Sequence, residues 1–371
     1  MIYFDYAATT KPDPEIIKLH NKINQEYWYN SETLYEEGEK AKALYNEACN
    51  QIINTLKLNN KKILFTSGAT EANNTAIYGY LNKYYKEPKE IITTVFEHAS
   101  TLNVYKDLEK KGFKVTYLKP DNKNIISLKE LEDVINSNTV LLSIMWVNNV
   151  TGFIFPIKDI IEIKKKHPRL KLHVDMVQGF SKIEPDFNYN DIDFLTFSSH
   201  KLHGIKGSGL LIYPNNVELS FLQGGHQQDG IRPGTLDLAG AITTAKVIKQ
   251  NNIDIKKRYN EVNKLHDYLI NGLKNYDHLI LNLKYHKSPY ILNIVFKNLK
   301  GETALHSLDE KGIIVGTGSA CNSSSKEQEL SLIYTLDDAS LAINSIRISL
   351  SEETTYQELD ILIKELGLIG K

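Results

Sequence analysis

Apolar and polar positions follow one another along the first two thirds of the chain in a pattern that predicts strands separated by helices. Seven short runs rich in β-branched and aromatic residues have the length of buried strands. They are KILFT (62–66), IITTV (91–95), KVTYL (114–118), VLLSIMWV (140–147), LKLHVD (170–175), DFLTFSS (193–199) and GLLIY (209–213). Segments with helical spacing lie between several of them, such as 127–137 and 156–168. This order predicts an α/β domain with a mostly parallel seven-stranded sheet and helices on both faces.

The last third of the chain predicts a second, smaller α+β domain. Its apolar runs and helical segments are an amphipathic stretch (241–273), YILNIVF (290–296), ETALHSLDEKG (302–312), SIRISL (345–350) and TYQELDILIKELGLI (355–369). We expect a large domain over residues 13–250 and a small C-terminal domain over residues 251–371. The N-terminal segment 1–12 is expected to pack on the small domain.

Composition restricts the class of protein. The chain has 371 residues, is 42% hydrophobic, and has a formal net charge of -1 at pH 7. It is long enough for a large core, and this charge does not favour a nucleic-acid partner. No apolar run reaches the roughly 20 residues that span a bilayer, and the N-terminal sequence MIYFDYAATTKPDPE lacks the pattern of a secretory signal. With only two cysteines, we expect a cytoplasmic protein in a reducing compartment.

The two cysteines lie in different contexts. Cys49 belongs to a segment whose apolar residues repeat at helical spacing, which predicts an unreactive core position. Cys321 lies in GTGSACNSSSKEQE (316–329), which has no hydrophobic period and is typical of a loop. A thiol on such a loop is either incidental or a reactive group.

Several strands are followed directly by side chains that suit a phosphorylated ring. Since ligands bind beyond the carboxyl ends of parallel strands, these positions should meet at one edge of the sheet. The turn before Thr70 begins a helix, whose free N–H groups suit a phosphate. Asp175 ends one strand and could face a protonated ring nitrogen or simply cap the next helix. Ser198, His200 and Lys201 end another strand, where burial would lower the pKa of the lysine for Schiff-base chemistry.

Other strand-associated residues suit an amino-acid substrate. His98 follows a strand end, where it could stack on a planar ring or transfer protons. Asn149 follows another strand as a neutral donor, and Arg347 lies in the apolar run SIRISL, where it needs an anion. Together these residues match the requirements of pyridoxal phosphate acting on an amino acid.

Two alternative chemistries fit less well. A metal site at His200 and His203 lacks a cysteine or carboxylate at the usual spacing, so no metal is expected. A nucleotide-binding oxidoreductase would use GTGSAC as a glycine-rich loop, but Cys321 occupies the third glycine position.

At this level of detail the sequence resembles the cysteine desulfurases, class V aminotransferase-like enzymes of pyridoxal phosphate fold type I. The likeness extends over almost the whole chain. Its motifs are FDYAATT (4–10), FTSGATEANN (65–74), TTVFEHAS (93–100), VNN..G (147–152), HVDMVQ (173–178), SSHKLHGIKG (198–207), RPGT (232–235), GSAC (318–321) and SIRISL (345–350).

The resemblance implies a role for each matched residue. Lys201 matches the lysine that links covalently to the cofactor, and Cys321 matches the nucleophile that takes the sulfur. Asp175 matches the partner of the ring nitrogen, Gln178 the donor to the ring hydroxyl, and His98 the residue that stacks on the ring and transfers protons. The remaining matches are phosphate contacts at Thr70, Ser198 and His200, a further cofactor contact at Ala69, and a phosphate contact from the other subunit of a homodimer at Thr235. Asn149 and Arg347 match the substrate-carboxylate contacts.

The implied reaction converts L-cysteine to L-alanine and leaves the sulfur as a persulfide on Cys321. A sulfur-acceptor protein, such as an iron–sulfur scaffold or a tRNA-thiolation enzyme, would then receive it. Selenocysteine lyase, cysteine sulfinate desulfinase and a non-catalytic sulfur-relay protein are alternatives on the same scaffold. The chain also departs from the family pattern at Ser31, Tyr35, Val150, Ile205 and His226. These departures concern substrate preference and rate, since the matched cofactor residues are intact.

Overall fold

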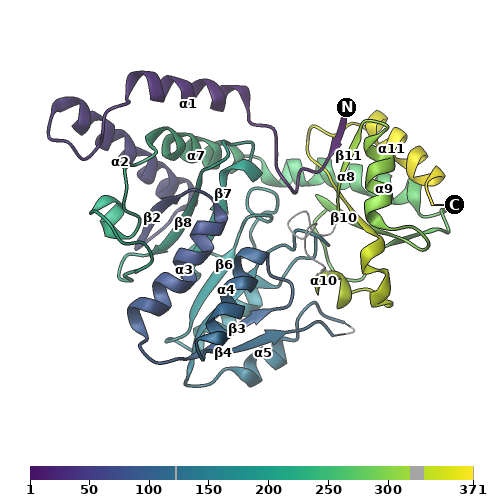
Figure 1. Ribbon diagram of the computed structural model, residues 1–371, viewed down its shortest axis with the longest axis horizontal. Helices are drawn as coiled ribbons and strands as arrows, with labels where there is room; N and C mark the ends of the chain where they lie inside the picture. The colour runs from purple at the N-terminus through teal and green to yellow at the C-terminus, as the bar shows by residue number, and fades with distance from the viewer. Residues whose placement is uncertain (122, 318–329, 371) are drawn as a thin grey trace.

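The computed structural model describes residues 1–121, 123–317 and 330–370. Two sheets of different size form two lobes that lie side by side, with both chain termini at the smaller lobe (Figure 1). The larger sheet has seven strands and the smaller has five. This architecture confirms the predicted α/β fold with a mostly parallel sheet and a smaller α+β unit.

The seven-stranded sheet has the order β2-β8-β7-β6-β5-β3-β4. Its strands, in sheet order, are β2 (Lys61–Thr66), β8 (Gly209–Pro214), β7 (Phe194–Ser198), β6 (Lys171–Asp175), β5 (Thr139–Met145), β3 (Glu90–Thr94) and β4 (Lys114–Leu118). β8 pairs antiparallel with both of its neighbours, while the pairs from β7 to β4 are all parallel. Every residue of β5 is buried, as a central parallel strand covered on both faces requires.

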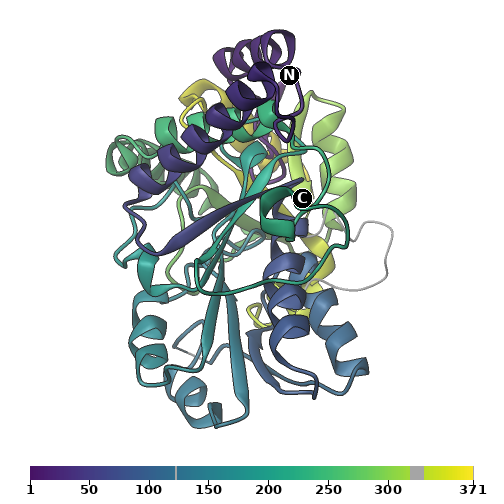
Figure 2. The same ribbon diagram turned by 90° about the vertical axis from the view of Figure 1, so that its left-hand side faces the viewer.

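Helices cover both faces of this sheet (Figure 2). They are α1 (Pro14–Glu26), α2 (Glu36–Leu56), α3 (Ala69–Tyr84), α4 (Ala99–Lys110), α5 (Leu128–Val134), α6 (Ile157–Lys165) and α7 (Leu238–Asn251). Successive residues of a strand point to opposite faces of the sheet. Leu142 packs with residues of α2, α6 and α7 on one face, and Leu141 packs with residues of α3 and α4 on the other. Cys49 lies half-buried against the first cluster, and burial raises its pKa to about 11, which fits an unreactive thiol.

The five-stranded sheet joins the two ends of the chain. Its order is β1 (Ile2–Phe4), β11 (Ile313–Thr317), β12 (Ser345–Ser349), β10 (Ile291–Phe296) and β9 (Leu279–Leu281). The helices α8 (Ile255–Leu273), α9 (Gly301–Asp309), α10 (Leu330–Ile333) and α11 (Tyr356–Leu368) belong to this part of the chain. β1 pairs parallel with β11, so the first residues of the chain are part of the C-terminal sheet. The domain boundaries themselves stay a prediction.

The amphipathic stretch 241–273 forms two helices rather than one. The chain leaves α7 at Asn252 and enters α8 through Asp254, whose φ of 54° is left-handed and incompatible with a continuing helix. Short 3₁₀ turns complete the structure: η1 (Tyr189–Asp191), η2 (Ser199–Lys201), η3 (Gln227–Gly230) and η4 (Ala339–Asn344). Within the described ranges, no helix is both long enough and apolar enough to cross a membrane.

Candidate active site

A cavity of about 670 Å³ opens where the carboxyl ends of β5, β6 and β7 face the five-stranded sheet. Met145, Asp175 and Ser198 are the last residues of these three strands, and all three line the cavity. The volume is in the range of small-molecule sites, and the position is the one at which open α/β sheets bind ligands.

Most of the residues singled out in the sequence meet in this cavity. Those that line it are Ala69, Thr70, His98, Asn149, Asp175, Gln178, Ser198, His200, Lys201 and Arg347. Thr235 is exposed and does not line the cavity of its own chain. Cys321 lies outside the described residues. Six residues that were not predicted from the sequence also line the cavity: Ala7, Ala8, Thr9, Glu97, Lys106 and Lys206.

One end of the cavity suits a phosphate group. The helix α3 begins there after Gly68, which has a φ of 153° and provides no side-chain cap for the first N–H groups. A Cβ at Gly68 would meet no atom within 4 Å, so the space in front of this helix end is open. His200 lies at the same cavity, and burial lowers its pKa to about 4, with the Lys201 charge adding to the effect. An uncapped helix N-terminus beside a neutral imidazole fits an anion with oxygen acceptors.

Asp175 is held as a buried carboxylate by two hydrogen bonds. Its Oδ1 accepts from the Val177 N–H at 3.0 Å, and its Oδ2 accepts from Asn73 Nδ2 at 3.0 Å. Asn73 in turn contacts His173, whose pKa burial lowers to about 3, through an Oδ1 to Nε2 distance of 3.1 Å. A carboxylate fixed in this way beside a cavity fits a protonated ring nitrogen.

Asn73 was not predicted as a site residue, although it lies within the motif FTSGATEANN. It comes one turn after the start of α3, and nothing in its spacing separated it from an ordinary helix residue. Asn73 Nδ2 also donates to Ser100 Oγ at 2.9 Å, and Ser100 Oγ lies 2.8 Å from His98 Nδ1. A continuous polar chain therefore joins His98 to Asp175.

The geometry of His98 defines its tautomer. Its Nδ1 accepts a hydrogen bond from the Ser100 N–H at 3.1 Å, so the proton of the neutral ring is on Nε2. Burial lowers the pKa of His98, and the nearby Asp175 charge only partly opposes that effect. The ring is thus a neutral imidazole that can accept or donate a proton at the cavity.

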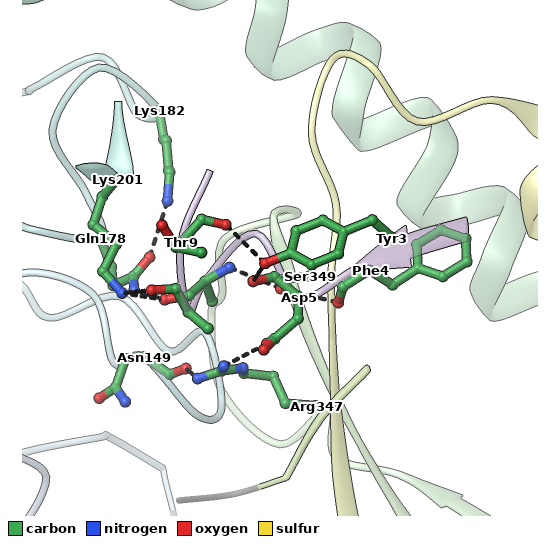
Figure 3. A network of polar contacts seen from close by, with 12 residues as sticks. Tyr3, Phe4, Asp5, Thr9, Asn149, Gln178, Lys182, Lys201, Arg347 and Ser349 are labelled. Carbon is green, nitrogen blue, oxygen red and sulfur yellow. Dashed lines mark hydrogen bonds and ion pairs between the residues drawn. The ribbon is translucent and has the colours of Figure 1, made fainter. Parts of the chain in front are cut away.

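The N-terminal segment after β1 crosses the cavity between the two sheets (Figure 3). Lys201 Nζ donates to the carbonyl oxygens of Ala7 and Ala8, both at 2.6 Å. Gln178 Nε2 donates to the same Ala7 oxygen at 2.9 Å. On the other side, the Ala7 N–H donates to Ser349 Oγ at 2.9 Å. This segment therefore connects cavity residues of the larger lobe to the smaller sheet.

Arg347 is buried, with only 3% of its surface exposed, and carries a charge that must be balanced. Its Nη2 lies 2.6 Å from Asp5 Oδ1, and its Nη1 donates to the Asn149 carbonyl oxygen at 2.8 Å. Its Nε finds no hydrogen-bond partner among the described residues. The Arg347 side chain lines the cavity, so its guanidinium is placed to balance an anionic group of a ligand there.

The positions that depart from the family pattern lie in different surroundings. Val150 is buried with Leu332 and Ala342 in a small apolar cluster between the two lobes. An apolar residue fits this cluster, where a carboxylate would be unpaired. Ile205 packs against the main core and Ser31 is buried, while Tyr35 and His226 are exposed.

The fold is an α/β fold, and its cavity brings together a lysine, a hydrogen-bonded carboxyl group and a helix N-terminus without a side-chain cap. The aminotransferase class-V family matches residues 2–362, and the chain belongs to that family. Members of this family depend on pyridoxal phosphate.

The individual proteins to which this chain is similar include a cysteine desulfurase. The cysteine desulfurase IscS of Buchnera aphidicola subsp. Baizongia pistaciae is 37% identical over 370 residues, covering 98% of this chain and 91% of that protein. A solved NifS-like protein superposes with a TM-score of 0.90 at 30% identity, covering 99% of this chain and 98% of the other. The structure of SspA in complex with cysteine gives a TM-score of 0.82 at 29% identity, with coverages of 96% and 100%.

Proposed function

We propose that this chain is a pyridoxal phosphate-dependent cysteine desulfurase. The observation that carries the proposal is the convergence of Lys201, Asp175 and Arg347 on one cavity with the uncapped end of α3. Each group meets one requirement of the cofactor or of an amino-acid substrate. The homologues named cysteine desulfurase support the choice of reaction within the family.

The described residues fit the cofactor. Thr70, Ser198 and His200 would hold its phosphate with the N–H groups of α3, beginning at Ala69. Asp175 would pair with the ring nitrogen, and Gln178 would donate to the ring hydroxyl. Lys201 would supply the amine for covalent attachment once its contacts with Ala7 and Ala8 are released. Pyridoxal phosphate, when bound, supplies an electron sink for bonds at the α- and β-carbons of an amino acid.

The substrate carboxylate would bind at Arg347. The guanidinium lines the cavity, and the contacts with Asp5 and Asn149 hold it in one orientation. The SspA relative, whose structure is described as a complex with cysteine, supports L-cysteine as the ligand class. His98 Nε2 and Lys201 Nζ would then transfer protons at the substrate carbons.

Cys321 is the proposed sulfur acceptor, on the basis of its GSAC motif. Its thiolate would attack the sulfur of the substrate and form a sulfur–sulfur bond. The carbon–sulfur bond breaks with its electron pair staying on carbon, and that carbon takes a proton and becomes the methyl group of alanine. Cys321 is left as a persulfide, from which an acceptor protein would take the sulfur.

The proposed enzyme is a homodimer. Thr235 is exposed and away from the cavity of its own chain, which fits a phosphate contact supplied to the partner's cavity. Large apolar side chains are also exposed at the connection between α1 and α2, where Trp28 is 70% and Leu34 is 94% accessible. Sedimentation of wild type and of Leu34→Glu would test this assembly, with a wild-type monomer contradicting it.

Alanine release from L-cysteine tests the function directly. Wild type should release alanine, faster with a thiol reductant, and Cys321→Ala should release none. Alanine from both proteins would exclude Cys321 as the acceptor and favour a lyase or a desulfinase. No alanine from either protein, when both are loaded with cofactor, would contradict the desulfurase proposal. The same assay with selenocysteine measures which chalcogen is preferred.

A further inference from the structure

Lys182 contacts a cofactor-site residue without lining the cavity itself. Its Nζ donates to Gln178 Oε1 at 2.9 Å, from a position four residues later in the chain. Figure 3 shows the Lys182 ammonium and the N-terminal segment on either side of the Gln178 carboxamide. Lys182 can therefore influence the cavity indirectly, through the orientation of the Gln178 side chain.

The contact determines which way the Gln178 carboxamide faces. A lysine ammonium has donors and no acceptor, so only the amide oxygen of Gln178 can face it. The amide nitrogen must then face the other side, where Nε2 donates to the Ala7 carbonyl at 2.9 Å. A donor on one side and an acceptor on the other exclude the flipped amide, in which both contacts would be lost.

The surroundings of Lys182 keep its ammonium near this amide. Nζ lies over the Tyr290 ring, 5.9 Å from its centre, so the ammonium faces an aromatic ring. Burial lowers the pKa of Lys182 to about 8; the Glu352 charge opposes this shift and the Arg347 charge adds to it. The ammonium form therefore predominates at neutral pH. The ion-pair partner of Glu352 is Arg258, whose Nε lies 3.0 Å from Glu352 Oε1.

We propose that Lys182 is a positioning residue that holds the Gln178 carboxamide with its N–H₂ group facing the cofactor cavity. The proposal rests on the proposed function, in which Gln178 donates to the phenolic oxygen of the cofactor ring. A hydrogen bond donated to that oxygen stabilises its anionic form and so lowers the pKa seen in the visible absorption of the bound cofactor. Without the ammonium, only the contact with the Ala7 carbonyl still favours this orientation, so the amide turns its oxygen toward the cavity more often.

The test is a spectrophotometric pH titration of the holoprotein. Lys182→Met, which keeps length and removes the donor, should raise the pKa of the visible band by roughly 0.5 to 1 pH unit, a three- to tenfold change in proton affinity. Lys182→Arg, which keeps charge and donors, should stay at the wild-type value. An unchanged pKa in Lys182→Met would overturn the proposal.

A double-mutant cycle separates positioning from a direct effect of charge. In a Gln178→Ala background, Lys182→Met should no longer change the pKa, because the group through which Lys182 acts is gone. A shift that persists in full would show that Lys182 acts directly through its charge and would contradict the proposal. If Lys182→Met does not yield folded holoprotein, Lys182→Leu, which also has no donor, takes its place in both titrations.

The same experiment distinguishes failure of the proposed function from failure of the role proposed for Lys182. A wild-type protein that shows no visible band after incubation with pyridoxal phosphate would contradict the proposed function. A normal wild-type band whose pKa does not respond to Lys182→Met would contradict only the role of Lys182. Thermal unfolding of each variant identifies changes that come from lost stability alone.

Discussion

Asp5 and Arg347 form an ion pair between residues 342 positions apart in the chain, with Oδ1 and Nη2 separated by 2.6 Å; Arg347 is buried and Asp5 is partly buried. The pair joins the segment that follows the first strand to the middle of β12. It brings a carboxylate beside the arginine proposed to bind substrate, and it does so without using the arginine's Nε. The protein thus compensates part of the Arg347 charge while the arginine still lines the cavity.

Removing one partner of this pair should destabilise the fold. Asp5→Asn leaves the Arg347 charge buried without its counterion, and we expect a loss of about 3–5 kcal/mol in the free energy of unfolding. Urea denaturation of the apoprotein measures it. Glu26→Gln is the matched control, because it breaks the exposed Lys22–Glu26 pair and should cost well under about 1 kcal/mol. Equal effects in the two variants would contradict the prediction.

Arg347 should also determine the affinity for substrate. In Arg347→Ala the substrate carboxylate enters a buried site without a cation, and kcat/KM for L-cysteine should fall by the equivalent of roughly 2–5 kcal/mol, mainly through KM. Arg347→Lys should recover only part of the loss, because an ammonium cannot replace the planar fork. Steady-state kinetics test this, with the exposed Arg169→Ala as control. Wild-type KM and kcat in Arg347→Ala would remove Arg347 from the site.

Lys201 should be the single point of covalent cofactor attachment. Lys201→Ala should lose the visible absorption band after gel filtration, and borohydride reduction should no longer fix the cofactor to the protein. Lys249→Ala, which removes an exposed lysine on α7, should behave as wild type. Borohydride labelling that is undiminished in Lys201→Ala would assign the attachment to another residue.

Glu97 should make stability depend on pH. It is buried at the cavity, its Oε1 accepts from Thr94 Oγ1 and the Met145 N–H, and burial raises its pKa to about 8. Because the folded-state pKa lies above the unfolded value, the folded protein retains a proton that the unfolded chain loses. The stability that Glu97 contributes is complete below about pH 4.5 and declines as pH rises to about 8.

Glu97→Gln provides the comparison for that pH dependence. Its Oε1 can accept the same two hydrogen bonds, and it cannot ionise. The variant should match wild type near pH 4 and become progressively more stable than wild type between pH 5 and pH 8. Urea denaturation across this range measures the difference, and parallel curves for the two proteins would show that Glu97 is already ionised when folded.

The sequence pattern predicted the central strands well because their signal is local. KILFT, LKLHVD and DFLTFSS correspond to β2, β6 and β7 with ends that differ by one residue at most. The short strands β1 and β9 were missed, since three residues carry too little periodicity to be recognised. The break at Asp254 was missed as well, because a single left-handed residue leaves the amphipathic pattern on either side intact.

The sequence by itself determined the alternation of strands and helices, and with it the edge of the sheet where Asp175, Ser198 and Lys201 meet. This was possible because parallel strands bring their carboxyl ends to one side, so position along the chain predicts position in space. Only the tertiary structure decided the contacts of Asp5 with Arg347, of the Ala7 carbonyl with Lys201, and of Lys182 with Gln178. These contacts depend on how the two lobes and the N-terminal segment pack together. The positions of backbone carbonyls and the orientations of side chains produce no periodic pattern in the sequence, so they could not be predicted from it.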